Sequence, residues 1–464
     1  MVRPKTTGGL DMRVGTRDVR RKLIAGAAVL AAVAFVAGAC GNSKNAGGTT
    51  ETTTTAKPAG GTDTTKVAVD APGVTDTEIR IGGVASVTNP LGGKYADAFV
   101  GAQAAVDAVN ANGGLYGRKL VLAAKRDDKL SNNKAEVESL LSSDNVFAVA
   151  PIATLLFTGA DTLVAQNVPT FGWTINPEWQ GDSTNPRNNL FGQSGSYLCF
   201  DCASPALPWL AKETKSHKIG VLAYNVAQSA DCASGVKNSF DKYGASADAT
   251  VAFLDKSLAY GTTDLSVQVS KMKDAGVDLI TTCMDTNGVV TLAKELKKQQ
   301  LTAKQYLPNG YDHEFVKEFG DLFEGSYVRT DFAQWELADK DQPQGLKDYL
   351  KATKAAGVEP SENGISGWLN VQTLVAGLKK AGPNFDRQKV IDAINSLDAF
   401  TGDGILHAVD WTKGHTEIAQ PDHPCSFISV IKDSEFVPSF SKPGKPFLCV
   451  DSSVPGKLTS SNES

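Results

Sequence analysis

The chain has 464 residues, of which 41% are hydrophobic and 8% aromatic, and its formal net charge at pH 7 is -5. This acidic balance argues against a nucleic-acid partner, which would call for a basic face. Beyond a short leader, the length suffices for about two domains with cores of their own.

The first 39 residues have the order of an export signal. A basic patch at residues 17–22 precedes an almost wholly apolar run at 23–37, and small residues then lead to Cys40. The run is short for a spanning helix of about 20 residues and has no positive stop on its far side. We therefore expect residues 1–39 to be a lipoprotein signal peptide. The pair Arg20-Arg21 leaves twin-arginine export open beside general secretion, although the rest of that motif is weak.

Cys40 stands between small residues and a polar tract. The preceding residues resemble a bacterial lipobox, in which a peptidase cuts before the cysteine and the thiol carries lipid, although Ala37 stands where leucine is usual. A buried cysteine in an uncleaved membrane anchor is the alternative. Residues 41–75, which include GGTTETTTTAKPAGGTDTT, cannot bury enough apolar area to offset their ordering entropy. We expect residues 40–75 to be a lipidated cysteine and a flexible linker that anchor the chain to the outer face of the cell membrane.

Strand and helix patterns alternate from residue 78 onward. Residues 78–86 (EIRIGGVAS) indicate a buried strand. Apolar residues then recur at helical spacing, three or four positions apart: Tyr95, Phe99, Ala102, Val106 and Val109. Further strands are expected at 119–124, 146–151 and 168–173, with a helix ending at Gln166. Such an alternation predicts a parallel sheet, whose ligands bind at the carboxyl ends of the strands.

A second alternation follows an exit segment at 189–196. Strands are expected at 218–224, 249–254, 277–283 and 305–308, with helices at 205–214, from 232, and at 264–275 and 289–299. Two similar lobes are implied. Beyond Gly325 come helices at 345–356, 364–381 and 386–397 and a β-rich tail. Periodicity alone does not show which lobe these last elements join.

Several stretches carry a family resemblance. They are IGGVASVTNPLGGKYADAFVGAQAAVDAVNANGGLYGRKLVLAAKRDD, VFAVAPIATLLFTGADTLVAQNVPTFG, KIGVLAYN, DLITTC and GWLNVQTLVAGLKKAG, of which NANGGLYGRKL is the most specific part. In this order they resemble the type I periplasmic binding proteins of the branched-chain amino acid transporter group. The resemblance implies an α/β fold of two doubly wound parallel-sheet lobes, joined by three crossovers around a ligand cleft. The lobes would be 76–196 with 330–404, and 197–329 with 405–464.

The resemblance also implies a small-molecule ligand, delivery to an ABC permease in the membrane, and a set of cleft residues. Ala153, Thr154 and Thr174 match loops that hold a carboxylate through backbone N–H groups and hydroxyls. In the first loop, however, apolar residues 155–157 replace the usual polar run. Asp285 lies near the family's partner for a ligand ammonium. The full candidate set is Tyr95, Ala153, Thr154, Trp173, Thr174, Asp285 and Asn309.

Three candidates also have an ordinary structural interpretation. Tyr95 can be the first residue of the apolar helix face, Trp173 can be core, and Asp285 can be a helix N-cap. Ser229 and Ala230 occupy the neighbourhood where amino-acid binders often offer a tyrosine, which departs from the pattern. The solute class therefore stays open among amino acids, amides and related organic acids.

Six cysteines remain after Cys40, an even number for an oxidising compartment. We favour a disulfide between Cys425 and Cys449 and leave the pairing of the other four open: Cys199, Cys202, Cys232 and Cys283. Cys199 and Cys202 form a CxxC before a helix, so a redox centre is the alternative to a structural disulfide.

Enzyme signatures are weak in this sequence. TNPLGGKY superficially resembles a phosphate loop, but Thr88 and Tyr95 stand where glycine and Ser or Thr should be. There is no GxSxG or HExxH, and His407, His415 and His423 fit solvated surface better than a zinc site. We expect a monomeric binding protein that is not an enzyme and needs no cofactor or metal. A ligand sensor with the same cleft stays open.

Overall fold

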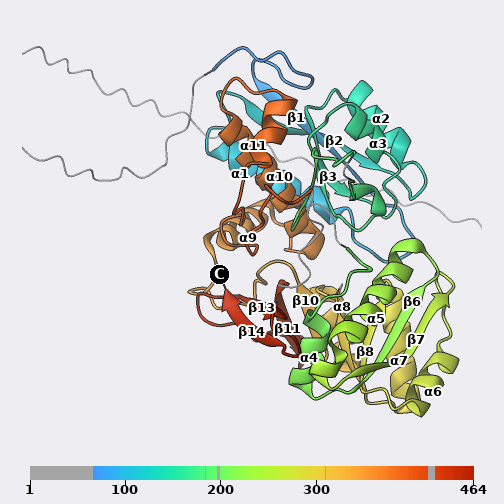
Figure 1. Ribbon diagram of the computed structural model, residues 1–464. Coiled ribbons are helices and arrows are strands. Elements are labelled where there is room, and N and C mark those ends of the chain that lie inside the picture. Colours follow the sequence, from blue (N-terminus) through green and yellow to red (C-terminus); the bar gives the residue numbers. More distant parts are fainter. Residues whose placement is uncertain (1–65, 183, 196–198, 309, 416–423, 464) are drawn as a thin grey trace, which may run out of the picture. The chain divides into compact units, whose positions relative to one another are not determined.

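The computed structural model describes residues 66–463 except 183, 196–198, 309 and 416–423. The expected signal peptide, Cys40, most of the linker and the candidate Asn309 therefore lie outside the described residues. The described residues form two α/β lobes, each built on one sheet (Figure 1). Among the helices of this part of the chain, none combines the length and apolar character needed to cross a bilayer.

The first lobe contains an all-parallel sheet of strand order β2-β1-β3-β4-β5. Every residue of the third strand is buried, as expected where helices cover both faces of a sheet. Ala85 and Ala153 pair at the ends of their strands, so the loops that follow start side by side. The strands are β1 (Glu78–Ala85), β2 (Lys119–Asp127), β3 (Ala148–Ala153), β4 (Thr170–Gly172) and β5 (Leu190–Gly192).

Helices from two distant parts of the chain cover this first sheet (Figure 1). From before the second lobe come α1 (Asp97–Ala111), α2 (Asn133–Ser142), α3 (Ala160–Ala165) and the 3₁₀ turn η1 (Pro177–Trp179). From after it come α9 (Gln344–Ala356), α10 (Glu362–Ala381) and α11 (Arg387–Ile394).

Glycines let α10 pack directly on α1. A Cβ at Gly101 would lie 1.6 Å from the carbonyl oxygen of Gly364, and one at Gly367 would lie 1.9 Å from that of Ala98. Only hydrogen fits at such an approach, so the two backbones touch. The contact shows that the chain returns to the first lobe after building the second sheet.

The second lobe contains a mixed sheet of order β14-β13-β11-β10-β9-β8-β6-β7, with β12 paired to β11. Its strands β6 to β10 are parallel, and the tail strands, red in Figure 1, add to β10 in antiparallel fashion. The strands are β6 (Lys218–Tyr224), β7 (Thr250–Leu258), β8 (Leu279–Cys283), β9 (Lys304–Leu307), β10 (Tyr327–Thr330), β11 (Cys425–Lys432), β12 (Glu435–Ser439), β13 (Phe447–Asp451) and β14 (Thr459–Glu463). Its helices are α4 (Ala206–Thr214), α5 (Ala227–Ala247), α6 (Ser266–Asp274), α7 (Thr286–Gln299), α8 (His313–Phe319) and the 3₁₀ turn η2 (Gly320–Leu322).

The chain passes between the lobes three times along the described elements, after β5, after β10 and after α11. The last passage begins later than residue 404. The Trp411 ring lies 5.1 Å from that of Phe191 in β5, and Val409 bridges to Phe400. Residues up to about 411 therefore pack with the first lobe.

All six cysteines of the folded body form disulfides. Cys425 and Cys449 are directly opposed on β11 and β13 and joined by an S–S bond of 2.03 Å, which is the pair favoured from the sequence. Cys199 pairs with Cys202, and Cys232 with Cys283. The second of these bonds fastens α5 to the end of β8.

Candidate functional site

Loops from the two lobes meet at the carboxyl ends of both sheets. Lys94, which follows β1, places its Nζ 3.0 Å from Asp312 and 2.6 Å from Glu314 at the start of α8. Gln228 of α5 reaches the Leu155 carbonyl oxygen at 3.5 Å. These contacts bring together the edges where an α/β sheet binds its ligands.

Tyr95 and Trp173 form an aromatic pair on the first-lobe side, with ring centroids 5.8 Å apart. Tyr95 is 8% exposed and packs in one apolar cluster with Phe99 and Ala153. Burial raises the pKa of Tyr95, and the charges of Asp285 and Glu362 add to the effect. The phenol is thus part of the core packing and also within electrostatic reach of the second lobe.

Thr154 begins the loop after β3 with a fully buried side chain whose Oγ1 has no hydrogen-bond partner within the described part of the chain. The neighbouring backbone is already engaged, because Leu155 N donates to Ser86 Oγ at 3.1 Å and Asn176 Nδ2 donates to Leu155 O at 2.7 Å. Thr174 is also buried, 2% exposed. An unpaired buried hydroxyl costs about 1–3 kcal/mol, so Thr154 is a group that gains from a new partner.

Asp285 is the N-cap of α7 and also faces two tyrosines. One carboxylate oxygen accepts from Gly288 N at 2.9 Å, and the other accepts from the Tyr224 hydroxyl at 3.1 Å. The Tyr224 and Tyr260 rings lie 4.7 Å apart. Burial, together with the Asp285 charge, raises the pKa of both phenols, that of Tyr260 to about 12, so both remain hydrogen-bond donors. Among the described side chains, no Lys, Arg or His forms an ion pair with Asp285.

Tyr224 and Tyr260 were not among the residues chosen from the sequence. Tyr224 ends the expected strand KIGVLAY, and no binding role was assigned to it from the sequence. Tyr260 follows β7, which runs to Leu258 and not to residue 254 as expected. Ser229, at the position where a tyrosine was sought, instead accepts from Tyr224 N at 2.8 Å and holds the end of β6.

Several charged residues lie close together where crossovers join the two lobes. Arg329 pairs with Asp331 after β10, and the Ser194 hydroxyl donates to Asp331 at 3.3 Å, linking two crossovers. Glu362 at the start of α10 is within electrostatic reach of this pair. Burial, with the charges of Asp331 and Asp312, raises the pKa of Glu362 to about 8, while Arg329 opposes the shift.

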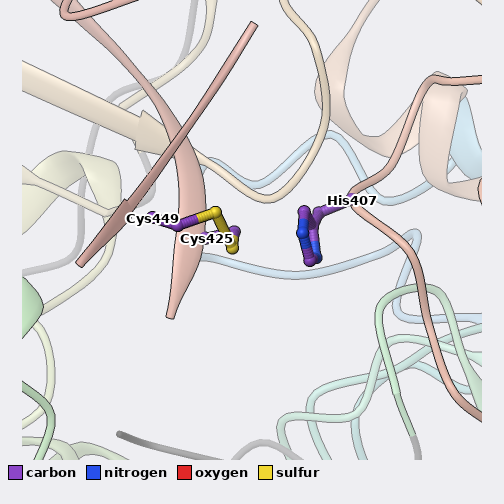
Figure 2. Close-up of side chains that lie close together, drawn as sticks. All are labelled: His407, Cys425 and Cys449. Atoms are coloured by element: carbon purple, nitrogen blue, oxygen red, sulfur yellow. A yellow bond between two sulfur atoms is a disulfide. The ribbon is translucent and has the colours of Figure 1, made fainter. Parts of the chain in front are cut away.

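Potential metal ligands gather where the tail begins, but two of them are bonded to each other. Figure 2 shows His407 beside the Cys425–Cys449 disulfide. The ligand atoms of these three residues lie within 4.8 Å of one another. A disulfide offers no thiolate, so the oxidised cluster lacks the ligand that a soft metal requires. His415 is not the solvated histidine expected: its ring lies 5.4 Å from Phe191, and burial lowers its pKa to about 4. His423 lies outside the described residues.

Two α/β lobes with facing loop edges, aromatic walls and a few convergent polar groups define the class of two-lobed proteins that bind small molecules between their lobes. Comparison with known proteins narrows the class. The model of the family described as "Periplasmic binding protein" matches residues 78–435. The chain belongs to this family, and to its type I members of the branched-chain amino acid transporter group.

Individual relatives are distant. The "Leu/Ile/Val-binding protein homolog 8" of Brucella abortus (strain 2308) is 24% identical over 345 residues, covering 69% of this chain and 81% of that protein. A branched-chain amino acid ABC transporter protein from Thermus thermophilus with bound valine superposes with a TM-score of 0.63 at 16% identity, covering 79% of this chain and 96% of that one. An R. palustris solute-binding protein in complex with 4-hydroxybenzoate gives a TM-score of 0.60 at 16% identity, with coverages of 78% and 95%.

Proposed function

We propose that this protein captures a small polar solute in the cleft between its lobes and delivers it to an ABC permease. The proposal rests on one observation: loops from both lobes meet around the carboxylate of Asp285. Asp285 lies within electrostatic reach of Tyr95 in one lobe and of Tyr224 and Tyr260 in the other. A solute that contacts all of these groups contacts both lobes and so favours their closure.

The solute belongs to the amino acids, amides and related organic acids. Asp285 offers a carboxylate to a ligand ammonium, and the aromatic rings provide walls for an apolar group. The unpaired Thr154 hydroxyl offers a hydrogen bond to a polar head, and Ala153 ends β3 while Thr174 follows the end of the neighbouring strand β4. Relatives named for Leu, Ile and Val, and one bound to 4-hydroxybenzoate, support both an amino acid and an aromatic acid as occupant.

Export and anchoring complete the proposal. We infer that residues 1–39 are removed, that Cys40 carries lipid, and that the linker up to about residue 75 holds the folded lobes near the outer face of the membrane. A lipid anchor retains a binding protein beside its permease where no outer membrane confines it. The protein acts as a monomer and binds its solute without turnover.

A thermal-shift screen tests this function. A solute that binds only the folded state raises the melting temperature by an amount that grows with the logarithm of its concentration relative to its dissociation constant. We expect at least one compound in a library of amino acids, amides and aromatic acids to raise it, with no compound consumed. Turnover of a compound, or a library without a single shift, contradicts the proposal.

A further inference from the structure

An aromatic ring beside Asp285 stays open to solvent in the second lobe. Tyr260, which follows β7, is 44% exposed although its ring is large and apolar. Its ring centroid lies 4.7 Å from that of the buried Tyr224, whose hydroxyl donates to Asp285. Asp285 is itself only half-buried. A solute can therefore touch both the Tyr260 ring and the Asp285 carboxylate from the solvent side.

The negative charge of Asp285 has no counter-ion. Its two oxygens accept from Gly288 N and from the Tyr224 hydroxyl, which fix the carboxylate without neutralising it. None of the ion pairs between described residues includes Asp285. A carboxylate can accept about four hydrogen bonds, so lone pairs remain for a solute. An organic cation at this place is attracted by the charge and also by the negative face of an aromatic ring.

Acidic groups outnumber basic ones where the loops of the two lobes meet. Lys94 is shared between Asp312 and Glu314, with N–O distances of 3.0 and 2.6 Å. Asp97 lies within electrostatic reach of the same three groups. The charge of Lys94 is therefore already compensated more than once, and it is not free to hold an anionic solute.

The joint between the lobes shows the same imbalance. Arg329 is paired with Asp331. Glu362 makes neither an ion pair nor a side-chain hydrogen bond with any residue that the structure describes, and it lies within electrostatic reach of Tyr95, as Asp285 does. An anionic group on a solute at this edge would lose its hydration without gaining a free cation.

A backbone donor of the loop after β3, expected to hold a solute carboxylate, is engaged within the protein. Leu155 N donates to Ser86 Oγ at 3.1 Å, and Ser86 N donates to the Ala153 carbonyl oxygen at 3.1 Å. The Thr154 hydroxyl is the unpaired donor of this loop. One hydroxyl serves the oxygen of a neutral carbonyl as well as that of a carboxylate. This loop therefore gives no advantage to an anion.

We propose that the bound solute is an organic cation, with an ammonium group held by Asp285 and the Tyr260 ring, an apolar body, and no free carboxylate. The inference rests on the proposed function and narrows its solute to amino acid amides and related amines. A zwitterionic amino acid has the ammonium group but adds a carboxylate that finds no free cation. A plain organic acid lacks the ammonium group altogether.

Matched derivatives of one amino acid separate these classes. With the full chain at about pH 6.5, below the ordinary pKa of an α-amino group, we expect calorimetry to give leucinamide an affinity at least about tenfold above that of leucine. The uncharged 4-methylpentanamide should also bind at least about tenfold more weakly than leucinamide. Phenylalaninamide, phenylalanine and 3-phenylpropanamide repeat the comparison with an aromatic body.

Two variants of Tyr260 test the role of the ring. Tyr260→Leu keeps an apolar side chain without a ring and should weaken leucinamide about threefold, with less effect on 4-methylpentanamide. Tyr260→Phe keeps the ring and should bind leucinamide as the wild type does. Melting temperatures without ligand, which should be similar for both variants, control for folding.

The possible results bear on different parts of the account. Amino acids that bind as tightly as their amides, or uncharged amides that match leucinamide, overturn the assignment of a cation while solute capture stands. Unchanged leucinamide affinity in Tyr260→Leu overturns the placement of the ammonium group against this ring. Failure of every compound in both series to bind counts against the proposed function itself.

Discussion

Asp285 is both the N-cap of a helix and a charged neighbour of the tyrosines in the candidate site. Its Oδ1 caps α7 through Gly288 N, and its Oδ2 accepts from Tyr224. The sequence left two interpretations of Asp285 open, a helix N-cap and a partner for a ligand ammonium, and one carboxylate can serve as both. A cap needs only an acceptor oxygen, whereas an ammonium partner needs the negative charge. Substitution by asparagine separates the two roles.

Asp285→Asn should leave the fold intact and weaken solute binding. Asparagine caps helices about as well as aspartate, so the free energy of unfolding should change by less than about 0.5 kcal/mol. For a solute with an ammonium group, affinity should fall more than about tenfold, or roughly 1.4 kcal/mol, by calorimetry. Asp386→Asn, at the N-cap of α11, is the control. Unchanged affinity in Asp285→Asn would remove this residue from the site.

The raised pKa of Glu362 predicts that the free energy of unfolding depends on pH. Its pKa of about 8 in the folded protein lies above the ordinary 4.5, so the folded state holds the proton more tightly than the unfolded chain. Stability should therefore fall as pH rises from about 4.5 to 8. Glu362→Gln lacks this dependence.

Denaturation at pH 5 and pH 8 measures the effect. The wild type should lose at least about 1 kcal/mol relative to Glu362→Gln over this range, since one pKa unit equals 1.36 kcal/mol. The exposed Glu359→Gln serves as the control and should track the wild type. Parallel pH profiles for the wild type and Glu362→Gln would show that the carboxyl is solvated.

At the scale of elements, the Cys232–Cys283 disulfide holds the site's second-lobe loop. Cys283 ends β8 immediately before Met284 and Asp285, while Cys232 lies on α5, whose Ser229 hydroxyl donates to the Cys283 carbonyl oxygen. The bond spans 51 residues, whereas Cys199–Cys202 spans 3. A longer closed loop removes more entropy from the unfolded chain.

The double variant Cys232→Ser/Cys283→Ser should lose about 3 kcal/mol of unfolding free energy and bind its solute more weakly, because α5 no longer fixes the end of β8. Cys199→Ser/Cys202→Ser is the matched control and should lose less. Denaturant unfolding and calorimetry measure the two effects. Equal losses in both double variants would argue against a positioning role for the longer bridge.

Sequence patterns predict most strands of this fold within a few residues, because each is a continuous apolar run between two helices. They miss α8, whose seven residues are mostly polar, and β5, whose three residues are too few to show a period. The packing of α10 on α1 depends on Gly101 meeting Gly364, a contact far apart in the chain. No local pattern contains that information, and here the family resemblance supplied it.

Local sequence patterns also reveal only part of the candidate site. Tyr95 and Asp285 were chosen because the family resemblance implies a tyrosine and an acid in these loops, and the structure brings both within electrostatic reach of Tyr260. Tyr224 was hidden inside an apolar strand pattern, and Tyr260 lay beyond the expected end of its strand.

At the scale of the whole molecule, ion pairs join the lobes across the cleft. Lys94 contacts Asp312 and Glu314, so the contacts exist only while the first-lobe loop lies against α8. Glu314 is 84% exposed, and such surface pairs contribute about 0–1 kcal/mol. They bias closure without locking it.

Lys94→Gln should weaken solute binding about threefold at low salt, since the lobes lose a stabilising contact in the closed state. The difference from the wild type should shrink in high salt, because exposed ion pairs are screened. Lys134→Gln, an exposed lysine on α2, is the control. Calorimetry at two salt concentrations measures both effects, and a salt-independent difference would point to a non-electrostatic cause.

Closure of the two lobes on a solute is the central claim of this account, and small-angle scattering tests it most directly. The full chain is measured with and without a compound that raises its melting temperature. We predict that saturation with this compound decreases the radius of gyration as the lobes approach each other. Scattering curves that superpose at saturation, with the form of one rigid body without a gap, would contradict the claim.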